Sequence, residues 1–275
     1  MAHKVDLAAY KEDGFCIVRE VFHASAIRNI AAAFEDLKYQ ARDFTDDTFV
    51  GPTYFNLHRD CDPFDKKVVD LKPVSGELRR VTYPYLVSEV LNTYRVFEPL
   101  LRCAEKVLGP DIVQLVNQAN FNPPKRGTGW GWHQDYRFRR KGLSAVPKSF
   151  VQCLLAVDEC NEENGGLRLV RKSDSLGPLQ LDTMPEQFDQ HVNPSMIVQP
   201  LLRSGDIILF NPYIIHGSTP NRTDRERRVY INGFAATSAV THGIPVLQNG
   251  IVLPTSSGIM EFEDDPARLP PVVKY

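Results

Sequence analysis

The sequence lacks the features that mark secreted, membrane and nucleic-acid-binding proteins. Its 5 cysteines are odd in number and none shows Cys-x-x-Cys spacing, so we expect reduced core thiols and no disulfide framework. No apolar run approaches the length of a membrane span, and the N-terminus carries no secretion signal. The 32 basic and 34 acidic residues give a net charge of −2, and nothing in this balance suggests nucleic acid or membrane as a bulk partner. A cytoplasmic location is the default expectation.

What the chain does contain is the composition of an ordinary globular protein. It has 275 residues, of which 43% are hydrophobic and 24% charged. This length is enough for one large all-β or α+β domain and does not require two. We therefore expect a single domain over residues 1–275, with a helical part at 5–108, core strands at about 112–236 and a C-terminal extension at 238–275. Oligomeric state is not readable from the sequence.

Two distant segments together predict a metal site. The first, WGWHQD at residues 130–135, contains His133 and Asp135 two positions apart, so on a strand both would point to one face. The second is a dense apolar strand pattern that delivers His216 at its end. Two histidines and one carboxylate leave adjacent coordination positions open, as in non-haem Fe(II) sites. A His-x-Asp tripeptide alone would more simply be a surface or core feature, and the second segment shifts the balance.

Arg227 is a candidate for binding an anion near that metal. It follows His216 by eleven positions, a spacing that suits a turn and an antiparallel return strand. At the start of that strand its guanidinium would point back towards the metal, where it can form two hydrogen bonds to a carboxylate. Arg228 is the competitor. Because neighbouring strand residues face opposite ways, only one of the two should reach the site.

These residues resemble the phytanoyl-CoA dioxygenase family of Fe(II)/2-oxoglutarate-dependent oxygenases. The likeness runs from about residue 5 to about residue 236 and is specific for the family but weak for the substrate. It is carried by YKEDGF at 10–15, WHQD at 132–135, DECNEENGGLRL at 158–169, Gly205-Asp206 with Phe210, HGS at 216–218, Pro220-Asn221 and Arg227.

The resemblance implies a mainly β fold with flanking helices, a double-stranded β-helix (jelly roll) with its metal site inside the open end. It implies Fe(2+) held by His133, Asp135 and His216, with 2-oxoglutarate chelating the metal and O2 taking the last position. The far carboxylate of 2-oxoglutarate would meet Arg227, helped by the Ser218 hydroxyl.

Polar residues also recur along a predicted strand at 112–122. Gln114, Gln118, Asn120 and Asn122 would share one face by alternation, and we expect that face to line a ligand cavity. The exposed face of an edge strand would show the same pattern. Related enzymes use Gln and Asn at comparable positions near the co-substrate, so the resemblance nominates Gln118 and Asn122.

Three further residues are candidates for contact with the prime substrate. Arg137 continues the alternation of the metal strand, and a cation there would favour an anionic substrate. Trp132 flanks the same strand and would wall the cavity, although a buried core indole explains it equally well. His58 lies in residues 40–78, which lack periodicity and indicate a long loop that covers the site. A loop histidine with local partners is the alternative.

Outside the strands the patterns are simpler. Ser25 begins a predicted helix of about fifteen residues, and residues 85–108 show helical patterning closed by Gly109-Pro110. The glycine pair Gly165-Gly166 most simply provides positive φ in a turn, and we assign it no chemistry.

By resemblance, the chain is a dioxygenase that oxidises, and most simply hydroxylates, an unactivated C–H bond of a small-molecule metabolite or natural-product intermediate, releasing succinate and CO2. Halogenases of similar fold lack the carboxylate that Asp135 provides here, so hydroxylation, desaturation or ring closure fits better. Two alternatives stay open. One is a cupin-like metal-dependent hydrolase or isomerase, and the other is a non-catalytic small-molecule binding protein. The prime substrate is not identified.

Overall fold

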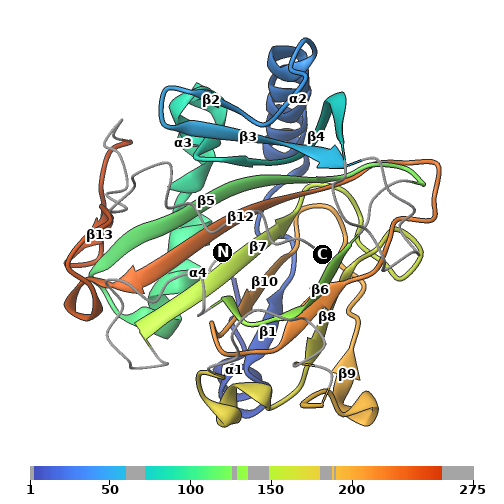
Figure 1. The fold of residues 1–275 in the computed structure, drawn as a ribbon. Coiled ribbons are helices and arrows are strands. Elements are labelled where there is room, and N and C mark those ends of the chain that lie inside the picture. The colour runs from blue at the N-terminus through green and yellow to red at the C-terminus, as the bar shows by residue number, and fades with distance from the viewer. Residues whose placement is uncertain are drawn as a thin grey trace.

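The computed structural model describes residues 3–59, 72–125, 129–135, 149–179, 188 and 190–255. Two antiparallel sheets and a set of helices make up this part of the chain (Figure 1). In chain order the elements are α1 (Leu7–Asp13), β1 (Phe15–Val18), α2 (Ala24–Ala41), β2 (Thr48–Val50), β3 (Thr53–Arg59), β4 (Pro73–Thr82), η1 (Pro84–Leu86), α3 (Glu89–Arg95), α4 (Glu98–Leu108), β5 (Ile112–Asn122), β6 (Trp130–His133), β7 (Phe150–Ala156), β8 (Leu167–Val170), η4 (Ser173–Leu176), η5 (Pro194–Met196), β9 (Ile197–Val198), β10 (Ile207–Phe210), β11 (His216–Ser218), β12 (Arg227–Ala236), η6 (Thr237–Ala239), β13 (Ile244–Gln248) and β14 (Ile251–Val252).

The sheet topology confirms the predicted jelly roll. The larger sheet has the order β1-β10-β7-β12-β5-β4-β3-β2, and β13 also pairs with β5 and with β14. The smaller sheet has the order β6-β11-β8-β9. Strands distant in sequence are neighbours in both sheets, which is how the two predicted halves of the metal site come to lie side by side.

One face of the larger sheet packs against the helices. Helix α2 buries Ile30, Phe34 and Leu37 at helical spacing, and these join a cluster with Ala119 and Phe121 of β5. None of the described helices is both long and apolar enough to cross a bilayer. The predicted helix at Ser25 is confirmed, although it begins one residue earlier and runs to Ala41.

The other face of the larger sheet packs against the smaller sheet. Leu169 of β8, Phe210 of β10 and Val229 of β12 are buried in this second cluster. On the outer side of the smaller sheet, Val170 and Ile215 belong to a separate, third cluster. Part of the space between the sheets is therefore filled by an apolar core.

The buried thiols behave as expected. Cys16, Cys103, Cys153 and Cys160 are free and buried, and burial raises the pKa of Cys16 and of Cys103 to about 12. They are protonated core residues. Cys61 lies outside the described residues.

The expectation of a long loop at residues 40–78 is wrong where the structure describes it. β2, β3 and β4 extend the larger sheet through this region. Register shifts between Asn56 and Leu57, and between Leu57 and Arg59, break the two-residue alternation. Because that alternation is the signal from which strands are predicted, the sequence pattern looked irregular.

Gln114 also corrects a prediction. Val116 pairs with Gly233 of β12 and Gln114 pairs with Phe234, so Leu115 is an extra residue in β5. This bulge reverses the alternation of side chains along β5. Gln114 therefore points to the helix side, while Gln118, Asn120 and Asn122 point between the sheets. The helical pattern at 85–108 is likewise interrupted, giving η1, α3 and α4 in succession.

Candidate metal and co-substrate site

The three predicted metal ligands converge between the sheets. His133 on β6 pairs directly with His216 on β11, so the two imidazoles project to the same side, with ring centroids 4.2 Å apart. Asp135 follows β6, and its Oδ1 lies 3.9 Å from Nε2 of each histidine. One ligand atom from each residue lies within 4.8 Å of the others. These three side chains could hold one metal ion.

Hydrogen bonds orient both imidazoles for that role. Nδ1 of His133 lies 2.8 Å from the Gly131 carbonyl oxygen, and Nδ1 of His216 lies 3.0 Å from that of Ile214. A carbonyl can only accept, so Nδ1 carries the proton in each ring and the Nε2 lone pair is left to face the metal position. The donor set of two neutral imidazoles and one carboxylate fits Fe(II).

Gln134 is a positioning residue that the sequence reasoning missed. Its amide nitrogen donates to the carbonyl oxygens of Gly177 at 3.0 Å and Tyr213 at 2.5 Å. Its amide oxygen accepts from the backbone nitrogen of Leu179 at 3.0 Å. These bonds hold the segment between His133 and Asp135 against the loops beneath it. The only sequence signal was its place between the two ligands.

Arg227 is a buried cation beside this site. It starts β12, is 7% exposed, and pairs in register with Asn122 of β5. Nη2 donates to the Gly165 carbonyl oxygen at 2.7 Å, while Nε is buried with no hydrogen-bond partner among the described residues. Burial is the main cause that lowers the pKa of Arg227, yet a guanidinium stays charged. A fixed, buried cation with an unsatisfied donor is suited to an anionic ligand.

Gly165 explains how Arg227 is held. Its φ of +74° favours glycine, and a Cβ there would collide with the Thr219 carbonyl oxygen and the Asn122 side chain. This close approach places the Gly165 carbonyl, and so the guanidinium, at the Ser218 end of β11. The sequence pattern assigns no chemistry to Gly165-Gly166, whereas the structure shows Gly165 anchoring Arg227 through its backbone carbonyl.

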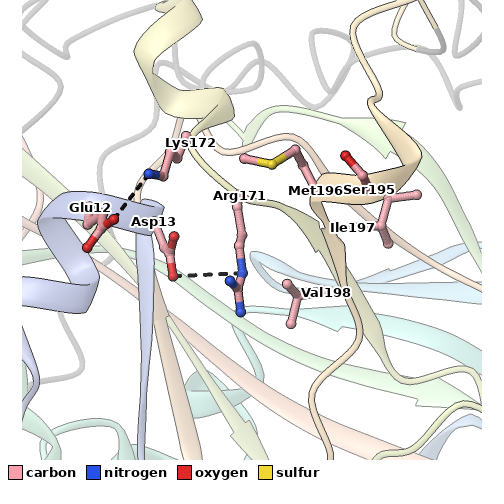
Figure 2. Close-up of a pocket in the computed structure, with 8 residues that line it drawn as sticks. All are labelled: Glu12, Asp13, Arg171, Lys172, Ser195, Met196, Ile197 and Val198. Atoms are coloured by element: carbon pink, nitrogen blue, oxygen red, sulfur yellow. Dashed lines mark hydrogen bonds and ion pairs between the residues drawn. The ribbon is translucent and has the colours of Figure 1, made fainter.

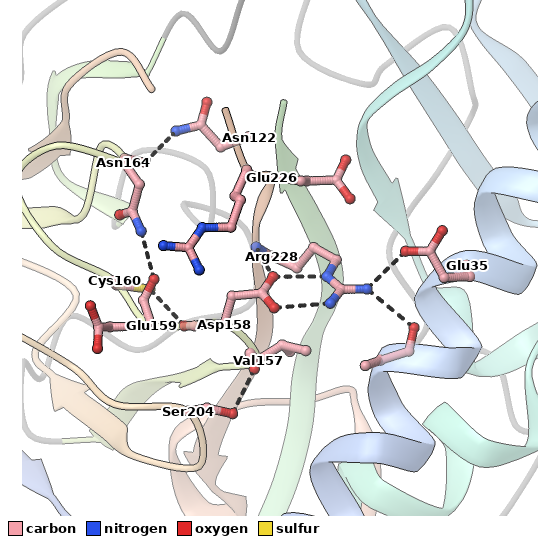
Figure 3. Close-up of polar contacts among 12 residues, drawn as sticks. Glu35, Asn122, Val157, Asp158, Glu159, Cys160, Asn164, Ser204, Glu226 and Arg228 are labelled. Carbon is pink, nitrogen blue, oxygen red and sulfur yellow. Dashed lines mark hydrogen bonds and ion pairs between the residues drawn. The ribbon is translucent and has the colours of Figure 1, made fainter. Parts of the chain in front are cut away.

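The other predicted co-substrate residues differ in position. Ser218 is buried two residues after His216, and its hydroxyl has no hydrogen-bond partner among the described residues. Asn122 is buried beside Arg227, but its amide nitrogen already donates to the Asn164 carbonyl oxygen at 3.2 Å (Figure 3). Gln118 is half-buried and faces the same space from further along β5.

Arg228 points the other way, as strand alternation requires. Its Nε and Nη2 donate to the two carboxylate oxygens of Asp158 at 2.8 and 2.9 Å, and Nη1 donates to Glu35 of α2 at 2.9 Å (Figure 3). This side chain ties the helix layer to the sheet. Only Arg227 of the pair faces the space between the sheets.

Of the three prime-substrate candidates, the structure describes Trp132 and His58, and it places them on different sides of the sheets. Trp132 neighbours His133 on β6 and therefore faces the outer side of the smaller sheet, where it packs in the third cluster and stacks with Arg168, the guanidinium carbon 4.5 Å from its ring. It does not wall the cavity. His58 is buried on the inter-sheet side of β3, and its Nε2 lies 3.4 Å from the Phe121 carbonyl oxygen. Arg137 lies outside the described residues.

A surface pocket lies apart from these ligands (Figure 2). Two ion pairs cross it, Lys172 to Glu12 at 3.1 Å and Arg171 to Asp13 at 3.8 Å. It is lined by Glu12, Asp13, Arg171, Lys172, Ser195, Met196, Ile197 and Val198. Because the charged groups on its walls pair with one another, this pocket presents no group that requires a ligand.

A jelly roll that carries two histidines and one carboxylate between its sheets defines the class of protein, a metal-binding double-stranded β-helix. The sequence profile of the phytanoyl-CoA dioxygenase (PhyH) family matches residues 10–229. The chain therefore belongs to the phytanoyl-CoA dioxygenase family.

Individual relatives are more distant. A probable alpha-ketoglutarate-dependent hypophosphite dioxygenase of Stutzerimonas stutzeri is 24% identical over 64% of this chain and 64% of its own length. A 2-aminoethylphosphonate dioxygenase of an uncultured bacterium is 31% identical over 48% of each. The chain thus spans about half to two thirds of the length of these relatives. The crystal structure of EctD from S. alaskensis with 2-oxoglutarate and 5-hydroxyectoine has a TM-score of 0.65 at 20% identity, covering 86% of this chain and 77% of that one.

Proposed function

We propose that this protein is an Fe(II)- and 2-oxoglutarate-dependent dioxygenase that hydroxylates a C–H bond of a small molecule, with release of succinate and CO2. The observation that carries this proposal is the convergence of three ligand atoms within 4.8 Å, together with the buried guanidinium of Arg227, which the Gly165 carbonyl holds near the Ser218 end of β11. A hydrolase using the same metal ligands would have no need for that second, anion-binding feature.

The residues of the site have two roles, metal binding and co-substrate binding. His133, Asp135 and His216 hold Fe(II), presenting Nε2 of each imidazole and one carboxylate oxygen. Arg227 and Ser218 hold the far carboxylate of 2-oxoglutarate, which supplies partners for the Arg227 Nε–H and the Ser218 hydroxyl. When both are bound, iron and 2-oxoglutarate supply the O2-dependent oxidation that no side chain can perform.

Burial of Arg227 serves this chemistry in two ways. It keeps water from competing for the guanidinium, and it strengthens the attraction for a carboxylate in a medium of low dielectric constant. Gln134 fixes the segment between two of the ligands, so His133 and Asp135 would keep their positions relative to each other when they hold a metal ion.

The substrate class is a small molecule that fits beside the metal. The two curated relatives are named for hypophosphite and for 2-aminoethylphosphonate, and the solved neighbour holds 5-hydroxyectoine. These names support a small polar metabolite as prime substrate, and they provide the compounds for a first panel.

The test is succinate formation with purified protein, Fe(II), 2-oxoglutarate and O2, measured with and without each panel compound. We expect slow succinate formation without a prime substrate, faster formation with the right one, and none without iron or O2. The Asp135→Asn variant is the matched control. Absence of 2-oxoglutarate binding in the iron-loaded protein, or substrate turnover without O2, would reject the proposal.

A further inference from the structure

Two arginines on β4 are brought to one side of the sheet by a second bulge. Asn56 of β3 pairs with Arg80, whereas the next residue, Leu57, pairs with Leu78, so Arg79 is the extra residue. A bulge lets two consecutive side chains point the same way. Their guanidinium carbons lie 4.0 Å (Arg79) and 5.7 Å (Arg80) from the ring of Trp130, and Arg79 also donates to the Gly129 carbonyl oxygen at 3.4 Å.

This pair stands beside the metal ligands. Trp130 begins the ligand strand β6, pairs with Ser218, and its ring centroid lies 6.4 Å from that of His133. Arg80 pairs in register with Asn120 of β5, whose amide oxygen is buried with no hydrogen-bond partner among the described residues. The arginine pair thus faces the inter-sheet space from a strand two places away from Arg227 of β12.

His58 adds an unsatisfied group to the same corner. It is 3% exposed, and its Nδ1 has no hydrogen-bond partner in the described part of the chain. Burial, followed by the positive charge of Arg79, lowers the pKa of His58 to about 3, so the ring is neutral at physiological pH. With Nε2 facing the Phe121 carbonyl oxygen, Nδ1 is left as an acceptor for a ligand donor group.

We propose that Arg79 and Arg80, beside Trp130, bind an oxyanion of the prime substrate, while Asn120 Oδ1 and His58 Nδ1 accept hydrogen bonds from a donor group of the same molecule. The oxyanion is a carboxylate or a phosphorus oxyanion, and this subsite is separate from the Arg227 position that holds 2-oxoglutarate. The inference rests on the proposed function, because it assigns the class of substrate for that same metal site. Two guanidiniums close to one indole offer the planar, two-pronged hydrogen bonding that such anions favour.

The chain provides its own reporter for this subsite. It has 2 tryptophans, and Trp132 lies on the outer face of the smaller sheet, so a Trp132→Phe variant leaves Trp130 as the single indole. This variant is loaded anaerobically with Fe(II) and saturating 2-oxoglutarate. Its fluorescence is then titrated with inorganic phosphate, with acetate, and with acetamide as the uncharged comparison.

We expect a saturable change in Trp130 emission with at least one of the two anions and none with acetamide. Arg79→Gln and Arg80→Gln, each made in the same background, should raise the half-saturating anion concentration about tenfold or more. Arg79→Lys should give an intermediate half-saturating concentration, since lysine keeps the positive charge but lacks the two-pronged donor geometry of a guanidinium. Arg28→Gln, an exposed arginine on α2, is the matched control and should change nothing. A lower half-saturating concentration for phosphate or for acetate assigns the chemical class.

Three results would overturn the subsite. These are no saturable change, a change that survives both glutamine variants, or a change that 2-oxoglutarate competes away and Arg227→Gln abolishes. The last result would place the anion at the co-substrate position. Binding of 2-oxoglutarate is measured first on the same protein, and the titration is repeated without it. Failure of the proposed function therefore shows as lost 2-oxoglutarate binding, while failure of the subsite shows in the anion titration alone.

Discussion

The two faces of the larger sheet treat buried polar groups in opposite ways. On the helix side, Gln114 accepts from Arg95 at 2.8 Å and donates to Asn232 at 2.8 Å. Asn117 donates to Asn232 at 2.8 Å and to the hydroxyl of Tyr230 at 2.6 Å, which in turn donates to the Leu91 carbonyl oxygen at 2.8 Å. Every member of this network has a partner, so its polar groups add specificity to the core at little cost.

On the inter-sheet side, several buried polar atoms have no hydrogen-bond partner among the described residues. They include Nδ1 of His58, Oδ1 of Asn120, Oε1 of Gln152, Oγ of Ser218 and Nε of Arg227. Leaving such a group unsatisfied costs about 1–3 kcal/mol. Because the polar side chains that β5 and β12 present to the helices form a satisfied network among the described residues, the unsatisfied set between the sheets indicates a binding site that ligands complete.

The largest expected effect on activity comes from the loss of a metal ligand on the inter-sheet side. Asp135→Asn removes the negative charge between the two imidazoles, so we expect succinate formation to fall at least about 100-fold. The helix-side variant Tyr230→Phe should leave succinate formation at the wild-type rate. A purified Asp135→Asn protein that retains more than a tenth of the wild-type rate would contradict the assigned ligand set.

The two neighbouring arginines provide the next test. Arg227→Gln should raise the half-saturating concentration of 2-oxoglutarate by about 30- to 1000-fold, because truncating one partner of a buried charge pair costs about 2–4 kcal/mol. Arg228→Gln should leave that concentration unchanged and lower the free energy of unfolding by about 1–3 kcal/mol, through loss of the Asp158 and Glu35 contacts. Initial rates and urea unfolding measure the two effects. If Arg228→Gln instead weakened 2-oxoglutarate binding, and Arg227→Gln only lowered the free energy of unfolding, the assignment of the two side chains to opposite faces of the sheet would be wrong.

Hydroxyl deletions test the comparison one group at a time. Tyr230→Phe leaves the Leu91 carbonyl oxygen and the Asn117 amide without their partner, and should lower the free energy of unfolding by about 1–3 kcal/mol. Ser218→Ala removes a hydroxyl that has no partner among the described residues, so the ligand-free protein should keep its stability. That variant should instead need about 3- to 10-fold more 2-oxoglutarate for half-saturation. Equal destabilisation by both variants would erase the distinction between the two faces.

The smallest effect concerns the pH dependence of stability. The folded-state pKa of His58, about 3, lies below its ordinary value near 6.5, so between these values the unfolded chain binds the extra proton. Stability from this residue is therefore present above pH 6.5 and is lost as pH falls towards 3. Between pH 6 and 4, His58→Leu should reduce the slope of unfolding free energy against pH by about 1.4 kcal/mol per unit. An unchanged slope in urea unfolding would show that His58 titrates normally in the folded protein.

The sequence predicted the residues whose positions depend on simple alternation. His133 and Asp135 share a face because they are two apart on a strand, and Arg227 and Arg228 separate because they are adjacent. The jelly roll and the family followed from the motifs around these residues.

The failures occur where a bulge or a tertiary contact overrides alternation. The extra residue Leu115 reverses the facing of Gln114, and the register shifts on either side of Leu57 hide the strand pattern within residues 40–78. An extra residue in one strand is defined by its partner strand, so a single segment carries no sign of it. Gly165 acts through a backbone carbonyl, which no side-chain motif reveals.

A crystal structure of the protein prepared anaerobically with Fe(II) and 2-oxoglutarate tests the central claim most directly. The account predicts one iron bound to Nε2 of His133, Nε2 of His216 and a carboxylate oxygen of Asp135, with Arg227 Nε and the Ser218 hydroxyl bonded to the far carboxylate of the co-substrate. Iron bound elsewhere or through Nδ1, or a co-substrate that does not touch Arg227, would contradict it.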